Sequence, residues 1–261
     1  MTEKGQPSAL NHAWKRVGWA HEDRQALFEA IIAFQASEPY MFRIDRYGTY
    51  AEAVFTRHAG PDEEARAYDS FARSFGSFLD NCRAALNYTA YQLALLSNEQ
   101  NSDSGPNPEV VEFPIYTDPE KLRGLWWFRK FPAHIQAALE VWQPDRGNAG
   151  LLMLHELSRK YRHRLIHPVA VFPFADQSEV VVDGHVVQVE VLCTGAPLRD
   201  NDPILRFPLR DNPDAALDPV IPIGVGIDDE TCAGRLCTSV ANDIITNTVD
   251  ATKALLGEFF M

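Results

Sequence analysis

The chain lacks the features that mark membrane and secreted proteins. It has no run of about 18 apolar residues, the minimum for a membrane-spanning helix. Its first residues, MTEKGQPSALNHAWKR, contain no apolar stretch of the kind found in secretory signals. We therefore expect a cytoplasmic protein with reduced thiols and no membrane contact. The cysteines, which form neither a CxxC pair nor a disulfide pattern, are Cys82, Cys193, Cys232 and Cys237.

The motifs of several enzyme classes are also missing. The sequence contains neither the GxSxG motif of serine hydrolases nor the HExxH motif of zinc proteases. The segment GVGIDDE, residues 224–230, lacks the third glycine and the strand-to-helix context of a dinucleotide-binding loop. We therefore expect neither a cofactor nor a metal centre.

Negative charge is concentrated in the last third of the sequence. The chain has 36 acidic and 24 basic side chains and a formal net charge of -12. Residues 176–261 contain 15 acidic and 5 basic side chains, whereas residues 1–175 contain 21 acidic and 19 basic ones. An acidic surface repels the phosphate backbone of nucleic acids. The charge therefore argues against broad binding to DNA or RNA and leaves room only for a local basic patch.

Helices dominate the pattern of the first 170 residues. We expect a flexible arm over residues 1–20, a helix over 21–37 and a β-hairpin at about 40–57. A wide apolar stripe predicts a long helix from Pro61 to about residue 98. The polar segment that follows predicts a loop.

Shorter helices are predicted between residues 118 and 166. Asp118 before Pro119 is typical of an N-cap followed by proline at the first helical position. Further helices are expected to begin at Pro132 and Asn148. The last one should end at about Ile166, because a residue that precedes proline avoids the helical region of backbone space.

Strands and turns dominate the sequence after residue 170. Alternating valines around Asp183-Gly184 predict a β-hairpin with a type I′ turn. Residues 203–210 and 220–227 are further strand candidates, and a helix is expected from about Cys237 to the end.

These elements predict an α+β fold. The expected architecture is a helical bundle with an N-terminal β-hairpin, followed by an antiparallel β-rich part and a C-terminal helix. After the arm at residues 1–20, residues 21–170 should form a mainly helical region and residues 171–261 a β-rich region with the last helix. We expect the two regions to pack as one globular unit.

The stretch HELSRKYRHRLIHP, residues 155–168, is the main candidate for a functional site. It contains four basic side chains and three histidines. A solvated helix end explains them without any function, because the macrodipole stabilises cations there by about 0.3–1 kcal/mol each. As a binding surface, the stretch would offer His155, Arg159, His163 and Arg164.

Several segments resemble an uncharacterised family of bacterial proteins that join a helical region to a β-rich C-terminal part. Where that family has an Asp-His pair, this chain has Asn87 and Tyr88, and of a later Asp-Lys-His-Arg run only His163 and Arg164 match. The resemblance implies the same two-part fold and no established activity. It is carried by FLDNCRAALNYTAYQLA, LEVWQPD and LLMLHELSRKYRHRLIHP.

Arg162 and His167 resemble the paired residues of the HEPN superfamily of helical ribonucleases and toxins. Four residues separate them, as the HEPN pattern of arginine, four to six residues and histidine requires. Histidine can move a proton at neutral pH, and arginine can stabilise a phosphorane without a metal. The resemblance implies a metal-independent ribonuclease in which both residues are catalytic, with the site built at a dimer interface.

Histidine spacing offers a third hypothesis for the same stretch. His163 and His167 lie four residues apart, and His155 lies two helical turns before His163. Such spacing can bind zinc and would suit a metal-dependent hydrolase. Pro168 argues against it, because His167 should leave the helix.

We expect a non-catalytic intracellular binding or interaction protein. The missing acidic partners at Asn87 and Tyr161 and the negative net charge favour this hypothesis over the ribonuclease. Its partner would be an unknown small ligand or another protein, and the long helix offers a face for a homodimer.

Overall fold

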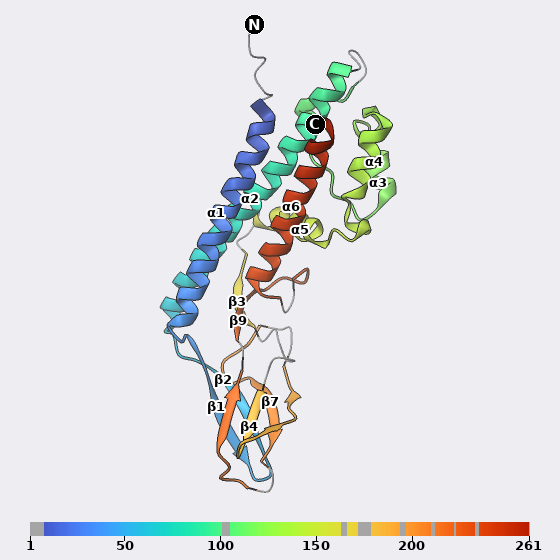
Figure 1. Ribbon diagram of the computed structural model, residues 1–261. Helices are drawn as coiled ribbons and strands as arrows, with labels where there is room; N and C mark the ends of the chain where they lie inside the picture. Colours follow the sequence, from blue (N-terminus) through green and yellow to red (C-terminus); the bar gives the residue numbers. More distant parts are fainter. Residues whose placement is uncertain are drawn as a thin grey trace. The chain divides into compact units, whose positions relative to one another are not determined.

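The computed structural model describes residues 8–100, 105–162, 166–171, 179–193, 197–209, 212–221, 223–232 and 235–260 (Figure 1). The chain forms two compact units. The helical unit consists of Met1–Ala26, Ser74–Leu165 and Val240–Met261, and the strand-rich unit consists of Leu27–Arg73 and Ile166–Ser239. Each unit therefore draws on sequence from both sides of the boundary expected near residue 170.

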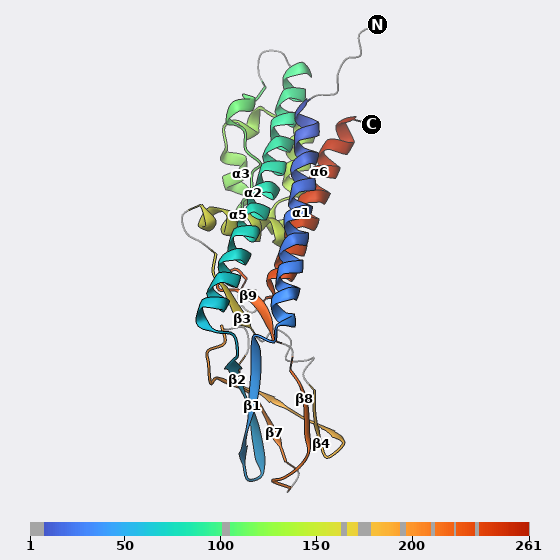
Figure 2. The same cartoon turned by 90° about the vertical axis from the view of Figure 1, so that its left-hand side faces the viewer.

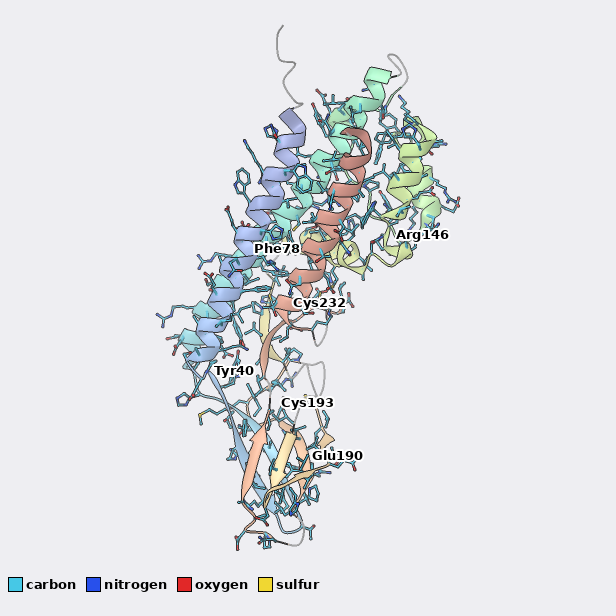
Figure 3. All side chains as sticks on the ribbon, viewed as in Figure 1. Tyr40, Phe78, Arg146, Glu190, Cys193 and Cys232 are labelled. Atoms are coloured by element: carbon cyan, nitrogen blue, oxygen red, sulfur yellow. The ribbon has the colours of Figure 1, made fainter. Side chains whose placement is uncertain are left out.

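Three long helices form the frame of the helical unit. They are α1 (Ser8–Ala36), α2 (Pro61–Gln100) and α6 (Cys237–Phe260), and they run side by side in both views (Figures 1 and 2). The acidic residues 62–64 in the first turn of α2 match the positive end of its dipole. The side chain of Phe78, labelled in Figure 3, lies fully buried in this unit. Its neighbours on the buried stripe of α2 are Phe75, Leu79, Cys82, Leu86 and Leu93.

Polar bonds tie these helices together. The Asp23 carboxylate on α1 accepts hydrogen bonds from Ser77 Oγ at 2.9 Å and from Asn81 Nδ2 at 2.7 Å, both on α2. Arg24 on α1 donates to Asn242 Oδ1 on α6. These bonds fix the register of α1 against its neighbours.

Helix α1 begins at Ser8 rather than at His21, so the flexible arm expected over residues 1–20 is wrong for residues 8–20; residues 1–7 lie outside the described part. The physical reason is a stripe of small apolar side chains. Ala13, Val17 and Ala20 have helical spacing, and all three are buried.

Three shorter helices complete the helical unit: α3 (Pro119–Gly124), α4 (Ala133–Val141) and α5 (Ala149–Tyr161). The Asp118 side chain accepts a hydrogen bond from Glu120 N at 2.9 Å, which confirms the predicted N-cap. Asn148 is the N-cap of α5, as expected. Short 3₁₀ turns lie at Pro108–Val110, Phe128–Lys130 and Pro144–Arg146.

The strand-rich unit contains three antiparallel sheets. The four-stranded sheet has the order β1-β2-β7-β6, the three-stranded sheet the order β5-β4-β8, and β3 pairs with β9. The strand bounds are β1 Tyr40–Tyr47, β2 Tyr50–Arg57, β3 Pro168–Val171, β4 Glu179–Val182, β5 His185–Val187, β6 Glu190–Val191, β7 Pro203–Pro208, β8 Leu217–Val220 and β9 Gly224–Ile227.

Both predicted hairpins are present. Strands β1 and β2 pair in register Tyr47↔Tyr50, and β4 and β5 pair in register Val182↔His185. Asp183 has a φ of 47° and Gly184 a φ of 78°, the two positive values that a type I′ turn needs. Phe55 on β2 belongs to the apolar core of the unit, together with Leu205 and Phe207 on β7.

The structure confirms the α+β fold class, with a C-terminal helix and antiparallel sheets. Within the described residues, none of the helices combines the length and the apolar character that crossing a membrane would require.

Candidate functional site

Three of the predicted site residues lie on helix α5 or at its end: His155, Arg159 and Arg162. Arg159 is exposed, and its Nη2 donates to Glu156 Oε2 at 2.8 Å. Arg162 follows the helix as its C-cap, and its Nε donates to the Ser158 carbonyl oxygen at 3.4 Å. This is the solvated, capped helix end that the macrodipole favours. His163 and Arg164 lie outside the described residues.

The end of α5 differs from the expectation. The helix ends at Tyr161 and not near Ile166, because Arg162 closes its last turn with bonds to Ser158. His167 lies in the strand-rich unit, directly before β3. It is exposed, and its carbonyl oxygen accepts a hydrogen bond from Asp228 N at 2.9 Å.

A cavity of about 220 Å³ opens beside His155 in the helical unit. Its walls come from three places: Arg83 on α2, His155 on α5, and the irregular segment 110–116 together with Trp127. Phe113, Pro114 and Ile115 make most of the segment's contribution apolar. The cavity therefore combines apolar side chains with the charged or titratable side chains of Arg83, Glu112 and His155.

Two amides hold the cavity wall in place. The Asn87 side-chain oxygen accepts a hydrogen bond from Phe113 N at 3.1 Å. Gln143 is 1% exposed; its Oε1 accepts from Tyr116 N at 2.9 Å, and its Nε2 donates to the Pro114 carbonyl oxygen at 3.0 Å. Asn87 thus has a structural role here.

Arg83 is the main source of charge in this cavity. Its side chain is only 16% exposed, and its Nη2 lies 3.6 Å from Glu112 Oε2. Its other terminal nitrogen, Nη1, is buried and has no hydrogen-bond partner among the described residues. Burial lowers the pKa of Arg83, and Glu112 acts in the opposite direction. A guanidinium stays charged in proteins, so a largely buried cation lines the cavity, and one of its donor atoms has no partner among the described residues.

His155 is the second titratable group of the cavity. It is half-buried, and burial lowers its pKa from the ordinary value of 6.5. The charges of Arg83, Arg159 and Arg162 lower it further, and Glu156 opposes them. His155 is therefore neutral at pH 7, with one nitrogen that donates and one that accepts hydrogen bonds.

Tyr88 lines a separate cavity of about 520 Å³ in the helical unit. Its ring meets the His12 ring edge-on at a centroid distance of 5.4 Å. Tyr91 and Arg16 also line this cavity, and Arg16 donates to Asn81 Oδ1 at 2.8 Å. Its arginine thus donates a side-chain hydrogen bond, whereas Arg83 Nη1 has no partner among the described residues.

The histidine trio expected for a metal site is not described as a whole, because His163 is outside the described residues. Within the described ranges, no three side chains of His, Cys, Asp or Glu come close enough together to hold a metal ion.

Reasoning from the sequence missed Arg83, although a signal was present. Arg83 lies between Cys82 and Leu86, which are both fully buried residues of the α2 stripe. A charged side chain next to a buried stripe is expected to be partly buried and to need an oppositely charged or hydrogen-bonding partner. Trp127 is 8% exposed and packs edge-on against Phe128 and Phe131.

Comparison of the chain with models of protein families, with curated proteins and with solved structures found no match. The functional argument therefore rests on the geometry of the cavity.

Proposed function

We propose that this protein is a binding protein that holds a small, negatively charged ligand in the Arg83–His155 cavity without converting it. One observation carries the proposal: Arg83 lines the cavity, and its buried Nη1 has no hydrogen-bond partner among the described residues. Leaving a buried donor unpaired costs about 1–3 kcal/mol, and more when the group is charged. An anion in the cavity would remove that cost.

The lining supports binding rather than catalysis. Phe113, Ile115 and Trp127 in the lining offer apolar contact and no acid or base. Glu112 also lines the cavity, but its side chain is 74% exposed and is paired with Arg83. His155 is the remaining acid–base group, and small-ligand pockets commonly use a few such polar groups to orient the ligand.

Removal of the Arg83 charge tests the proposal. Arg83→Gln keeps a hydrogen-bond donor but removes the cation, and Arg146→Gln serves as the matched control. Arg146, labelled in Figure 3, is 57% exposed and lies outside the cavity. Each full-length protein is heated in the presence of acetate, benzoate, inorganic phosphate and phenyl phosphate.

A ligand that binds only the folded state raises the unfolding temperature, by an amount that corresponds to about 2.7 kcal/mol at one hundred times its Kd. We expect at least one of the four anions to stabilise the wild type and Arg146→Gln but not Arg83→Gln. If none does, or if all three proteins respond alike, the proposal is wrong.

A further inference from the structure

We infer that this protein forms a symmetric homodimer in which strand β1 pairs antiparallel with β1 of a second copy, an inference that is independent of the proposed ligand-binding cavity. Strand β1, blue in Figure 1, is an end strand of the four-stranded sheet, with β2 as its neighbour on one side. Among the described residues, no strand pairs with its other side. The unpaired backbone groups of such a sheet edge can pair with another chain.

Strand β1 lacks the features that usually protect a sheet edge. Short strands, prolines and β-bulges are the common forms of protection. The other end strands have two to four residues: β6 has two, β5 has three, and β3, β8 and β9 have four each. Strand β8 also contains Pro219, which lacks an N–H. By contrast, β1 has eight residues and no proline, and it pairs with β2 from Tyr40 to Tyr47 without a register shift.

The backbone of every second residue of β1 is directed to its open side. Phe55 on β2 donates its N–H to Asp202 O at 2.8 Å, and its carbonyl oxygen accepts from Asn201 N at 2.9 Å, so both groups serve the chain that leads into β7. In an antiparallel sheet this direction alternates along the strand, so Phe55 is not hydrogen-bonded to Phe42, its pair on β1. The residues that offer N–H and C=O groups to a new strand are therefore Phe42, Ile44 and Arg46.

A two-fold axis at Ile44 gives a register in which the charges of the two strands match. Pairing Ile44 with Ile44 of the second copy places Arg43 opposite Asp45 of that copy, and Asp45 opposite its Arg43. Within one chain, Arg43 Nε lies 2.7 Å from Asp45 Oδ1, so both side chains are on the same face of the sheet. In the dimer the four groups would alternate in sign, and cross-strand pairs of opposite charge stabilise a sheet.

Other registers do not match these charges. An axis at Arg43 places two guanidinium groups directly opposite each other, and an axis at Asp45 does the same with two carboxylates. Like charges in such positions destabilise strand pairing. An axis at Phe42 or at Arg46 leaves Arg43 and Asp45 without an opposite charge across from them. The charge pattern therefore selects the axis at Ile44.

The same register covers two exposed apolar side chains. Met41 and Tyr47 are each 48% exposed. They lie three residues on either side of Ile44, so Met41 of each copy is opposite Tyr47 of the other. The Tyr47 ring is held in place by stacking on Tyr50, with a centroid distance of 5.1 Å, and contacts between a thioether sulfur and an aromatic ring are favourable. The strand is thus complementary to itself in charge and in apolar surface, as a two-fold dimer interface requires.

Arg46 is the remaining charge on β1 and does not oppose this pairing. Its guanidinium donates to the carbonyl oxygens of Pro213 at 2.6 Å and of Ala215 at 2.9 Å. In the proposed register it is opposite Phe42 of the second copy rather than another cation, and arginine next to an aromatic ring is a favourable neighbour.

Sedimentation equilibrium of the full chain tests the dimer. One strand pair is a small interface, so we expect a monomer–dimer equilibrium with a Kd of about 1–100 µM. Arg43→Asp and Asp45→Arg should each weaken association at least tenfold, because both place like charges opposite each other. Arg66→Asp is the matched control, since Arg66 is exposed on α2 and lies outside β1, and its Kd should stay within twofold of the wild type.

Combining the two reversals tests the register itself. An equal mixture of Arg43→Asp and Asp45→Arg should form a heterodimer, because each guanidinium of one chain then faces a carboxylate of the other. The double variant should dimerise with a Kd within about threefold of the wild type, since it exchanges the two charges and keeps their match. A wild type that stays monomeric up to about ten times the highest expected Kd overturns the inference. A dimer that neither single variant weakens, or that neither the mixture nor the double variant restores, also overturns it.

A pair of cysteines keeps the test decisive if the charge variants fail to fold. Met41→Cys and Tyr47→Cys are made separately, each with Cys193→Ser because Cys193 is only half-buried while the other cysteines are buried. In the proposed register residues 41 and 47 form a pair that is not hydrogen-bonded, with Cα atoms about 4.5 Å apart, a separation that suits a disulfide. Mild oxidation should link the two variants when they are mixed and should not link either variant to itself. Absence of the mixed product, or equal linking of each variant to itself, contradicts the pairing.

Discussion

The contact of α5 with α6 predicts that Gly150→Ala destabilises the protein. Gly150 is buried near the start of α5, and its N–H donates to Asn247 Oδ1 on α6 at 2.9 Å. A Cβ atom at this position would lie 2.8 Å from the carbonyl carbon of Asp243, closer still to its oxygen, and 2.6 Å from Asn247 Oδ1. Backbone atoms of α6 cannot turn aside as a flexible side chain can.

The magnitude follows from these distances. Ordinary contact begins near 3.4 Å, so the distance of 2.8 Å to the Asp243 carbonyl carbon requires α5 and α6 to move apart by about 0.6 Å. Overpacking of this kind costs about 1–3 kcal/mol, and stretching the bond to Asn247 costs about 1 kcal/mol more. The higher helix propensity of alanine offsets at most about 1 kcal/mol of this destabilisation. The free energy of unfolding should therefore fall by about 2 kcal/mol.

Urea unfolding followed by circular dichroism measures this change, with Gly18→Ala as the control. Gly18 is an exposed residue inside α1, and no described atom lies within 4 Å of its potential Cβ. Only propensity should act there, so Gly18→Ala should stabilise the protein by about 0.5–1 kcal/mol. Gly150→Ala with an unchanged or higher midpoint, at the same m value, would refute the close approach of α5 to α6.

Three further predictions concern the turn, the cavity and the ribonuclease hypothesis. Gly184→Val should lower the free energy of unfolding by about 1–2 kcal/mol, because the residue has a φ of 78°. Gly184→Asn should lower it less, and equal effects of the two substitutions in a urea titration would contradict the turn type. Burial lowers the pKa of His155, so the unfolded chain takes up a proton at this residue before the folded chain does as the pH falls below about 6.5. The free energy of unfolding should therefore decrease toward pH 5, and it should decrease less in His155→Gln. Parallel stability curves for the two proteins would falsify this reasoning. Purified protein should not cleave single-stranded RNA with or without metal, and cleavage that disappears in His167→Ala would establish the ribonuclease instead.

Local signals allowed much of the fold to be predicted. A type I′ turn needs positive φ at two positions, which Asp183-Gly184 provides at little cost, and the N-cap at Asp118 depends only on its own helix turn. The apolar stripe of α2 is long enough for its period to be unambiguous. Each of these features depends on residues close together in the sequence.

The start of α1 and the cavity were missed because they depend on tertiary packing. Ala13 and Ala20 are too small to mark a helix face by hydrophobicity, and only close neighbours make them buried. The cavity joins Arg83 to His155 across 72 positions of sequence, and no local pattern links these two residues. The sequence identified His155 on α5, but not the cation opposite to it.

The interleaving of the two units constrains the order in which a nascent chain can fold. The last segment of the strand-rich unit ends at Ser239, before α6 contributes Val240 onward to the helical unit. During synthesis every strand is therefore available before the helical unit receives its final helix, and domains usually fold as soon as their chain is complete. Until then, the faces of α1 and α2 that α6 will cover stay open to other chains. A premature stop near residue 239 would release a protein with finished sheets and an incomplete helix bundle, whose uncovered apolar faces favour aggregation and capture by chaperones.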